Sequence, residues 1–431
     1  MKKNTYRKYL LLVVLTTFFI SSSTSQTFRN VRPETVGMSS DRLERLTHQL
    51  ESYVESKKLS GGVALVLKKG KAAYFHSFGY RDLKSQDPME KDDIFRIASQ
   101  TKAIISVGIM ILQERGQLLI QEPVGNFIPE FNKTTVAVTN EEEGYSVMDV
   151  TRKITIRDLL THTAGIGWGF GPAKERWEKA DIMGWYFAHR DEPIQETVNQ
   201  IAGLPMDAQP GVRFVYGLST DILGALIEVI SGQPLDQFLQ NNIFDPLNMK
   251  DSHFYLPPDK NDRLASVYSS SESGITLSAN PGERVGASMI GQGHYVNGPQ
   301  KSFSGGAGLL STAEDYGAFL QMMLNGGTLN KKRIISQNTV NLMTVDHIGG
   351  IDFPWENGLG FGLGFYILKD LGARGTPGSV GEYGWVGAYH SIYWVDPKEA
   401  LVVVYFTQLI PAQDIDDHDK LRTLIYQAII D

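Results

Sequence analysis

The stretch SIYWVDPKEALVVVYF, residues 391–406, decides how this chain folds. Two runs rich in β-branched and aromatic residues, 391–395 and 401–406, flank the turn residues 396–399, a pattern that predicts a β-hairpin. A second hairpin is predicted near the other end of the chain, where GVALVL (62–67) and AAYFHS (72–77) are joined through a Lys-Gly turn. Strand pairs at both ends indicate one antiparallel sheet built from the two ends of the chain.

Helical patterns fill most of the remaining sequence. Helices are expected at residues 40–57 and 417–429, which would flank the sheet, and in the middle of the chain at 155–160 and 220–230. The segment 269–300 is rich in Ser, Gly, Asn and Pro and is expected to be a long surface loop. We therefore predict an α/β (α+β) fold. Its sheet domain would comprise residues 26–120 and 300–431, and a mainly helical domain, residues 121–299, would be inserted.

Composition narrows the possible functions. The 431 residues carry a formal net charge of −7, which argues against nucleic acid or an anionic membrane as the main partner. The chain has no cysteine, which excludes disulfides, thiolate catalysis and Cys-ligated metal. The acidic run 141–143 is expected to lie in a solvated loop.

The first 25 residues have the order of a secretory signal peptide. Basic residues at positions 2–8 precede an apolar run, residues 9–20, and then the small polar residues 21–25. The apolar run is short for a membrane span, although a retained anchor helix is the alternative. We expect cleavage near Ser25 and Gln26, export from a bacterium-like cell, and no membrane anchor afterwards.

The tetrapeptide SQTK, residues 99–102, is the strongest chemical signal in the sequence. No other serine is followed by a lysine three residues later, and the apolar run 103–112 predicts a buried helix after it. Residues three apart share one helix face, so the Lys102 ammonium can reach the Ser99 hydroxyl. A desolvated lysine can lose its proton and act as the base that a serine nucleophile requires. The alternative is an N-capping serine beside a surface lysine.

Two further segments have chemistry that would complement this pair. In FVYGL (214–218), Tyr216 follows a turn and precedes a helix, where its phenol could shuttle a proton. In GWVGA (384–388), glycines on an edge strand would let a substrate carbonyl approach a backbone N–H group, half of an oxyanion hole. Tyr216 could instead be an ordinary packed aromatic residue.

Taken together, these motifs resemble the serine β-lactamase and penicillin-binding-protein superfamily, in particular the class C-like branch with the family VIII carboxylesterases. The likeness runs from about residue 94 to 408 and includes IFRIA (94–98), LLTHTAG (159–165), SGGAGL (304–309) and WVDP (394–397). It implies a sheet domain and a helical domain with the serine at their junction. It also implies that Ser99 accepts the acyl group, that Lys102 and Tyr216 exchange its proton, and that Ser99 and Ala388 supply oxyanion N–H groups.

Departures from that pattern point to the substrate class. β-Lactamases of this kind usually carry Tyr-x-Asn and Lys/His-Thr-Gly, where this chain has Leu218 and Trp385 in place of the Asn and the cation. Each lost charge-assisted or amide contact costs about 1.5–3 kcal/mol, which disfavours an efficient penicillinase. Trp385 instead resembles the tryptophan of the Trp-Gly-Gly motif of family VIII esterases. Val386 replaces the first glycine of that motif and is expected to narrow the acyl pocket, and Gly387 matches the second. Arg374 is close enough in sequence to replace the missing cation.

Other polar and aromatic residues are expected to be structural. His162 is interpreted as a hydrogen-bonding residue at a helix end, and the segment 414–418 as a polar helix cap. No histidine spacing matches a metal motif, and Gly-x-Ser-x-Gly is absent, so we expect no metal, no cofactor and no α/β-hydrolase elbow. Trp168, Trp177 and Trp185 are expected to line the core or a pocket.

The sequence therefore predicts an exported serine hydrolase that forms an acyl-enzyme on Ser99, acting on small or hydrophobic carboxylic esters. The alternatives are a weak class C-like β-lactamase, a D,D-peptidase acting on peptidoglycan-like substrates, or an acyltransferase. A non-catalytic cell-wall binding protein that keeps the scaffold is an alternative from a different class. Neither the natural substrate nor the oligomeric state can be read from the sequence.

Overall fold

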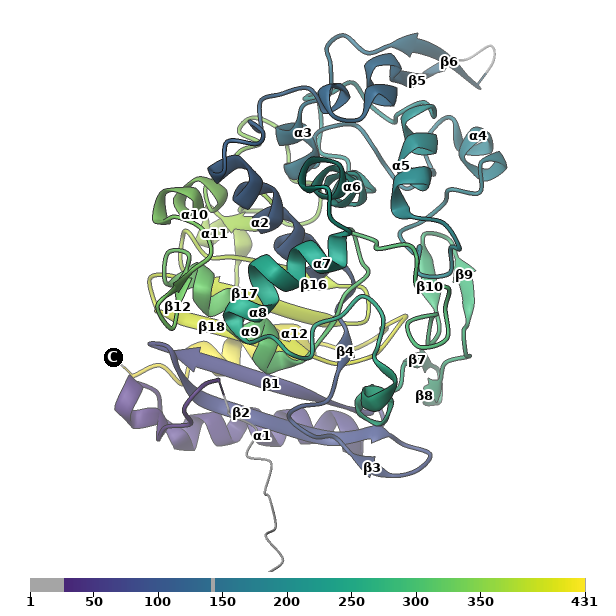
Figure 1. Ribbon diagram of the computed structural model, residues 1–431. Coiled ribbons are helices and arrows are strands. Elements are labelled where there is room, and N and C mark those ends of the chain that lie inside the picture. Colours follow the sequence, from purple (N-terminus) through teal and green to yellow (C-terminus); the bar gives the residue numbers. More distant parts are fainter. Residues whose placement is uncertain (1–26, 141–143, 431) are drawn as a thin grey trace, which may run out of the picture.

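The computed structural model describes residues 27–140 and 144–430, and is built around one antiparallel sheet of eight strands (Figure 1). The proposed signal peptide and the acidic run 141–143 lie outside the described residues. In spatial order the strands are β14 (Leu359–Phe361), β15 (Tyr366–Leu368), β16 (Tyr383–Gly387), β17 (Ser391–Asp396), β18 (Leu401–Phe406), β1 (Gly61–Lys68), β2 (Lys71–Asp82) and β3 (Asp87–Pro88).

The two predicted hairpins form the centre of this sheet. Strand β18 of the C-terminal hairpin pairs with β1 of the N-terminal hairpin, with Val63 opposite Phe406 and Lys68 opposite Leu401. Lys69 and Gly70, which join β1 to β2, both have positive φ angles (53° and 73°), as a tight two-residue turn requires. The prediction that both chain ends build one sheet is confirmed.

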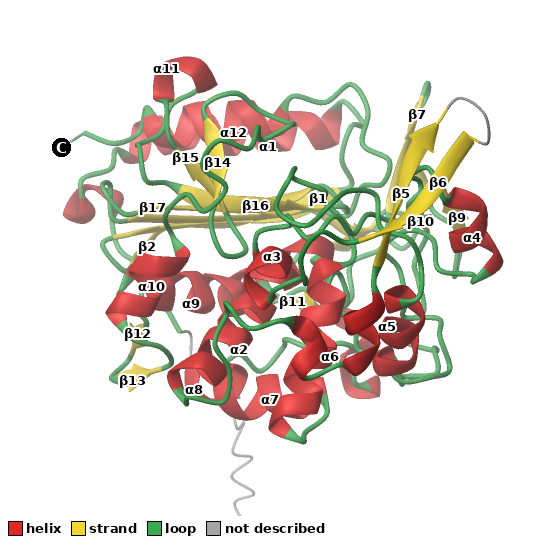
Figure 2. Ribbon diagram, turned by 90° about the horizontal axis from the view of Figure 1, so that it is seen from above, coloured by secondary structure: helices red, strands yellow, loops and turns green. Residues whose placement is uncertain are grey.

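Alternating side chains of these strands belong to two separate cores. Val63, Leu65 and Leu67 face the larger core, whereas Ala64 and Val66 face the smaller one. The smaller core is closed by α1 (Ser40–Glu55) and α12 (Asp417–Tyr426), which lie together on one face of the sheet (Figure 2). Both helices end three residues or fewer before their predicted ends.

The other face of the sheet is covered by α9 (Ala313–Leu324), behind which the buried helix α2 (Thr101–Glu114) packs against α6 (Ser219–Ser231) (Figure 2). The remaining helices of the described residues are α3 (Ile156–Leu160), α4 (Lys174–Lys179), α5 (Ile194–Ala202), α7 (Leu235–Leu239), α8 (Asp245–Leu247), α10 (Gln337–Met343) and α11 (Leu371–Arg374). Short 3₁₀ segments are η1 (Pro33–Val36), η2 (Ala98–Gln100), η3 (Val124–Asn126), η4 (Pro129–Lys133) and η6 (Pro258–Arg263), and η5 (Gln240–Phe244) is a π-helix.

The described residues also form small two-stranded sheets outside the main sheet. They are β4 (Phe95–Arg96) with β11 (Leu310–Ser311), β5 (Thr135–Asn140) with β6 (Gly144–Asp149), β12 (Thr328–Leu329) with β13 (Lys332–Arg333), β7 (Tyr268–Ser271) with β8 (Gly274–Leu277), and β9 (Glu283–Val285) with β10 (Ser288–Ile290). The last two hairpins correct the prediction of a long loop at 269–300. Most of their residues are exposed or half-buried and only Tyr268 and Met289 are buried, so their sequence lacks the alternation of buried apolar residues that signals a strand. The division into two domains near residues 120 and 300 stays a prediction.

Candidate active site

Ser99 lies in η2, at the point where the chain enters α2. The preceding residue, Ala98, has φ 42°, a conformation that a non-glycine residue rarely adopts and that is often found at functional sites. Three hydrogen bonds hold the turn in place. Tyr316 Oη donates to the Gln100 carbonyl (2.9 Å), Gln100 Nε2 donates to Ser391 Oγ (3.0 Å), and the Leu309 N–H donates to Thr101 Oγ1 (3.1 Å). The sheet and α9 therefore fix the backbone that presents the Ser99 hydroxyl.

Lys102 is buried beside Ser99, with 3% of its surface exposed. Its Nζ lies 3.2 Å from Ser99 Oγ and donates a second hydrogen bond, 2.6 Å long, to the Gly306 carbonyl. The structure thus brings the predicted pair together within proton-transfer distance. The alternative of a surface lysine is wrong, because the side chain is enclosed between α2 and the loop that carries Gly306.

A buried carboxylate stands behind this lysine. Asp221 Oδ1 accepts hydrogen bonds from Ser304 Oγ (2.6 Å) and from the Gly306 N–H (3.0 Å). Burial raises the pKa of Asp221, and its hydrogen bonds and the charge of Lys102 act in the opposite direction. Asp221 therefore anchors the loop whose carbonyl binds Lys102. It was not predicted from the sequence, because an aspartate in the first turn of α6 has the pattern of an ordinary helix start.

Tyr216 completes the cluster. Lys102 Nζ lies 4.7 Å from the centre of the Tyr216 ring, and Trp385 Nε1 donates a 2.9 Å hydrogen bond to the Tyr216 hydroxyl oxygen. Because this oxygen already accepts from Trp385, its own hydrogen is free to be donated elsewhere in the cavity. Tyr216 and Trp385, which belong to two separate sequence motifs, are thus in direct contact with each other.

The first two residues of strand β16 are paired on both sides, whereas its last three residues are paired on one side only. Its neighbour β15 pairs only with Tyr383 and Gly384, whereas β17 pairs along its whole length. The other edge of Trp385 to Gly387 is therefore without a strand partner. At Gly387 a Cβ atom would lie 2.6 Å from the Ile97 carbonyl oxygen, so glycine lets β16 approach the segment just before Ser99. The oxyanion role of the Ser99 and Ala388 N–H groups stays a prediction.

Ser99 opens into a cavity of about 210 Å³ whose walls are largely aromatic. Val386, as expected, is one of its walls and is 45% exposed. The lining residues are Ser99, Trp168, Trp185, Tyr216, Ala287, Ser288, Trp355, Trp385, Val386, Gly387 and Ala388. None of these residues, all from the described part of the chain, carries a formal charge.

The tryptophans separate into two roles. Trp168 and Trp185 line the cavity, whereas Trp177 is 1% exposed and packs in the larger core. Trp355 was not predicted from the sequence, yet its ring centre lies 4.8 Å from that of Tyr216 and 5.4 Å from that of Trp385. Trp355 belongs to no recognised motif. In the sequence it can be noticed only as a large aromatic residue within a loop that contains several glycines.

Two residues considered for the site lie elsewhere. Leu218, expected to face the substrate, is fully buried in the larger core and does not line the cavity. Arg374 pairs with Glu356 (3.4 Å) and lies over the Tyr366 ring, so it does not replace the missing cation. His162, interpreted as a hydrogen-bonding residue at a helix end, lies beside the site and packs against Tyr216 with 4.6 Å between ring centres. Its buried Nδ1 has no hydrogen-bond partner among the described residues, and burial lowers its pKa well below the usual value, so the ring is neutral.

One histidine cluster was not visible from sequence spacing. His390, Asp417 and His418 bring ligand atoms within 4.8 Å of one another, so they could hold a metal ion. However, His390 Nε2 is hydrogen-bonded to Asp417 Oδ1 (2.7 Å), and the two imidazole rings stack 4.1 Å apart at 13°. We interpret the cluster as a hydrogen-bonded tie between the β16–β17 turn and α12. The predicted helix cap at 414–418 coincides with the start of α12, where Asp416 is the N-cap residue but makes no side-chain capping hydrogen bond.

The sheet, the flanking helices and the serine–lysine pair define a serine acyl-transfer enzyme. The sequence model of the β-lactamase family ("Beta-lactamase") matches residues 46–427, and the chain belongs to this family. Protein Rv1367c of Mycobacterium tuberculosis (strain ATCC 25618 / H37Rv) is 31% identical over 375 residues, which cover 83% of this chain and 88% of that protein. Esterase EstB of Burkholderia gladioli is 29% identical, covering 84% and 89%.

Solved structures give the same assignment. EstCE1, described as a hydrolase with promiscuous acyltransferase activity, superposes with a TM-score of 0.75 at 25% identity and covers 90% of this chain and 99% of its own. Simvastatin synthase (LovD) from Aspergillus terreus superposes with a TM-score of 0.73 at 24% identity, covering 90% and 98%, which shows a shared fold. The protein is a serine hydrolase with the β-lactamase fold.

Proposed function

We propose that the protein is a carboxylesterase that forms an acyl-enzyme on Ser99 and prefers esters with a small hydrophobic acyl group. The observation that carries this proposal is the serine–lysine pair opening into an uncharged cavity walled by four tryptophans. Apolar and aromatic walls favour a hydrocarbon acyl chain. A β-lactam would bring a carboxylate into this cavity, where the lining residues offer no cation to pair with it.

The geometry supports the following sequence of steps. Ser99 Oγ attacks the ester carbonyl while its proton passes to Lys102 Nζ, 3.2 Å away. The backbone N–H groups of Ser99 and Ala388 stabilise the negative oxygen of the tetrahedral intermediate. The proton then reaches the leaving alkoxide through Lys102 or the Tyr216 hydroxyl, the C–O bond breaks, and the alcohol departs. In the second half, water gives its proton to the same pair and attacks the acyl-enzyme, releasing the acid and Ser99.

The test is single-turnover hydrolysis of p-nitrophenyl butyrate beside the cephalosporin nitrocefin. We expect rapid p-nitrophenol release by the wild type, loss of that release in Ser99→Ala, and almost no nitrocefin cleavage. Ser106→Ala is the matched control, because Ser106 is also buried and lies two turns further along α2. Nitrocefin cleavage comparable to ester cleavage would contradict the esterase proposal in favour of a β-lactamase.

Acyl transfer is the second candidate, because EstCE1 combines hydrolysis with acyltransferase activity and is 25% identical to this chain. Adding a primary alcohol to the ester assay separates the outcomes: a transferase forms the new ester, and a hydrolase releases only acid. Absence of a covalent fluorophosphonate adduct on Ser99 would instead identify a non-catalytic binding protein.

We also propose that the protein is exported after removal of about 25 residues. The basic, apolar and small-polar order of residues 1–25 supports this proposal. In the described residues, no helix combines the length and the apolar character needed to cross a bilayer. The intact mass of protein recovered from the periplasm or medium tests both export and the cleavage position, and a full-length cytoplasmic product would contradict it.

A further inference from the structure

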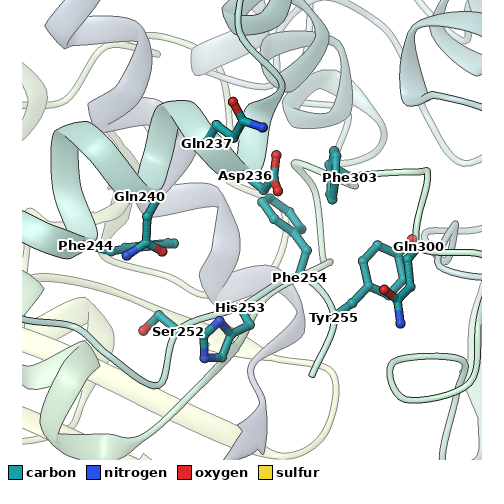
Figure 3. Close-up of a pocket in the computed structure, with 10 residues that line it drawn as sticks. All are labelled: Asp236, Gln237, Gln240, Phe244, Ser252, His253, Phe254, Tyr255, Gln300 and Phe303. Carbon is teal, nitrogen blue, oxygen red and sulfur yellow. The ribbon is translucent and has the colours of Figure 1, made fainter. Parts of the chain in front are cut away.

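A second cavity, of about 310 Å³, lies away from the catalytic serine and shares no lining residue with the catalytic cavity (Figure 3). It is formed by α7 and η5 on one side and by the segments 252–255 and 300–303 on the other. Its lining residues are Asp236, Gln237, Gln240, Phe244, Ser252, His253, Phe254, Tyr255, Gln300 and Phe303. The proposed esterase chemistry makes no use of this cavity.

Its charge is negative. The Oδ1 atom of Asp236 is buried and has no hydrogen-bond partner. Within the described residues, 27–140 and 144–430, the Asp236 carboxylate forms no ion pair. The nearby carboxyl of Glu228 accepts a hydrogen bond from the Leu235 N–H (2.9 Å), and its pKa is raised by burial and then by the charge of Asp236. The charge of Asp236 therefore acts on a second carboxyl group, that of Glu228, which itself does not line the cavity.

The one histidine in the wall does not offset this charge. His253 Nε2 lies 3.0 Å from Lys260 Nζ, and burial together with that ammonium lowers the pKa of His253 to about 4, so the ring is neutral. Lys260 itself pairs with Asp251 (2.9 Å) and does not line the cavity. At neutral pH, Asp236 is thus the only formal charge among the lining residues.

Aromatic rings surround the carboxylate. Figure 3 shows Asp236 directed toward the rings of Phe254 and Phe303, which lie 5.3 Å apart and are inclined at 56°. The ring of Tyr255 lies 6.0 Å from that of Phe303. Inclined aromatic faces beside a carboxylate attract an organic cation by two effects, ion pairing and the cation–π interaction. The Gln237 and Gln300 amides add polar groups for a hydroxyl or amide on the same ligand.

We propose that this cavity is a binding site for a small organic ammonium ion, held by Asp236 between the rings of Phe254, Tyr255 and Phe303. A cavity of this size accommodates a ligand of a few to about ten heavy atoms. An anionic ligand is excluded by the unpaired carboxylate. An inorganic cation would make less use of the aromatic part of the wall, which Phe244, Phe254, Tyr255 and Phe303 form beside the polar residues.

Calorimetric titration with choline tests the proposal, and its neutral isostere 3,3-dimethyl-1-butanol isolates the role of charge. We expect saturable 1:1 binding of choline and at least about tenfold weaker binding of the isostere. Asp236→Asn keeps the shape of the side chain and should weaken choline binding about tenfold or more. The matched control Asp419→Asn removes one charge from an exposed residue of α12, outside the cavity, and should change nothing.

The catalytic cavity also has aromatic walls, so the assay must distinguish the two sites. Titration is therefore repeated after Ser99 has been blocked with a fluorophosphonate, and ester hydrolysis at Ser99 reports that each variant is folded. Binding that persists in blocked protein and is lost in Asp236→Asn supports the proposal. Choline binding that is unchanged in Asp236→Asn, equal binding of the isostere, or no saturable heat at millimolar choline overturns it.

The ammonium group could belong to a free solute or to a lipid headgroup. Sedimentation with phosphatidylcholine vesicles separates these sources. Asp236-dependent binding to free choline alone identifies a soluble ligand, and Asp236-dependent binding to vesicles identifies the headgroup.

Discussion

Asp221 acts on the reaction through two neighbouring groups, without contacting the cavity. Its carboxylate holds Ser304 and the Gly306 N–H, and the Gly306 carbonyl in turn accepts from Lys102. Asp221→Asn can still accept both hydrogen bonds, but it removes the negative charge that stabilises the Lys102 ammonium formed during acylation. We expect kcat for p-nitrophenyl butyrate to fall about tenfold, and KM to remain unchanged.

The kinetic constants distinguish this positioning role from a purely structural one. For Asp221→Asn we expect a lower kcat at unchanged KM and unchanged melting temperature. An unchanged kcat with a lower melting temperature would mean that Asp221 only supports the fold.

Trp355 is the residue most exposed among the aromatic walls of the catalytic cavity, at 53%. Trp355→Ala should raise KM for butyrate esters about tenfold and leave kcat and the melting temperature nearly unchanged, because the ring lines the cavity beside Tyr216 and more than half of its surface is exposed. Steady-state kinetics with acetate and butyrate esters measure the effect. Phe170→Ala, a 45% exposed aromatic residue outside the cavity, is the control and should show no change.

At this scale, sequence reasoning finds residues whose chemistry is local. Ser99 and Lys102 lie three residues apart, and Tyr216 and Trp385 belong to short motifs, so all four could be named from the sequence alone. Asp221 and Trp355 could not, since their roles depend on contacts with segments far away in the chain. Leu218 was misplaced because the motif fixes its position in the chain but not the side toward which it points.

Among the elements, the second half of β16 needs glycine at position 387. In Gly387→Ala the new Cβ would lie 2.3 Å from Ser391 Oγ and 2.6 Å from the Ile97 carbonyl, so the strand must move away from Ser99. We expect ester kcat/KM to fall a hundredfold or more, since displaced oxyanion donors alone cost about that factor. Gly350→Ala, whose Cβ would meet nothing within 4 Å, is the control. Full activity in Gly387→Ala would contradict the assigned approach of β16 to η2.

Helix α9 carries a carboxyl group that couples stability to pH. Burial raises the pKa of Asp315 from about 3.8 to about 7, although the Asp251 N–H and Ser252 hydroxyl bind it. The native state therefore keeps a proton that the unfolded chain loses, so stability should fall as pH rises from about 4 to about 7 and stay constant above. Asp315→Asn should remove this loss, gaining about 2–3 kcal/mol relative to wild type between pH 5 and pH 8. Urea unfolding at both pH values measures it, and a pH-independent difference would contradict it.

The helices and strands differ in how well they can be predicted from their sequence. The strands at 62–67 and 401–406 are buried on both faces and are continuous apolar runs bounded by turns, so they were predicted within about two residues or better. Strands β7 to β10 have three or four residues each, most of them exposed or half-buried, and their pairing depends on turns that hydrophobic periodicity does not report. These two hairpins, of which β9–β10 reaches the catalytic cavity at Ala287 and Ser288, were therefore not predicted from the sequence.

At the scale of the whole molecule, backbone hydrogen bonds outside the sheet join the two ends of the described chain. The Ser39 N–H donates to the Ala428 carbonyl (2.8 Å), and the Ile430 N–H donates to the Gly37 carbonyl (3.0 Å). Ala428 is fully buried in the core between α1, α12 and the sheet. This closure lies on the face of the sheet opposite to α9 and α2, the helices that hold the active-site turn (Figure 2).

Deleting residues 428–431 should therefore separate stability from catalysis. The deletion removes both backbone hydrogen bonds and a buried apolar contact, a loss of about 2–4 kcal/mol that should lower the melting temperature by several degrees. Because the Ser99 turn is held from the other face, kcat/KM for p-nitrophenyl butyrate at low temperature should stay within about twofold of wild type. Ile430→Ala, which keeps the backbone bonds and alters a half-exposed side chain, is the matched control and should barely change the melting temperature. Loss of activity in protein that is still folded would instead mean that the two faces of the sheet are coupled.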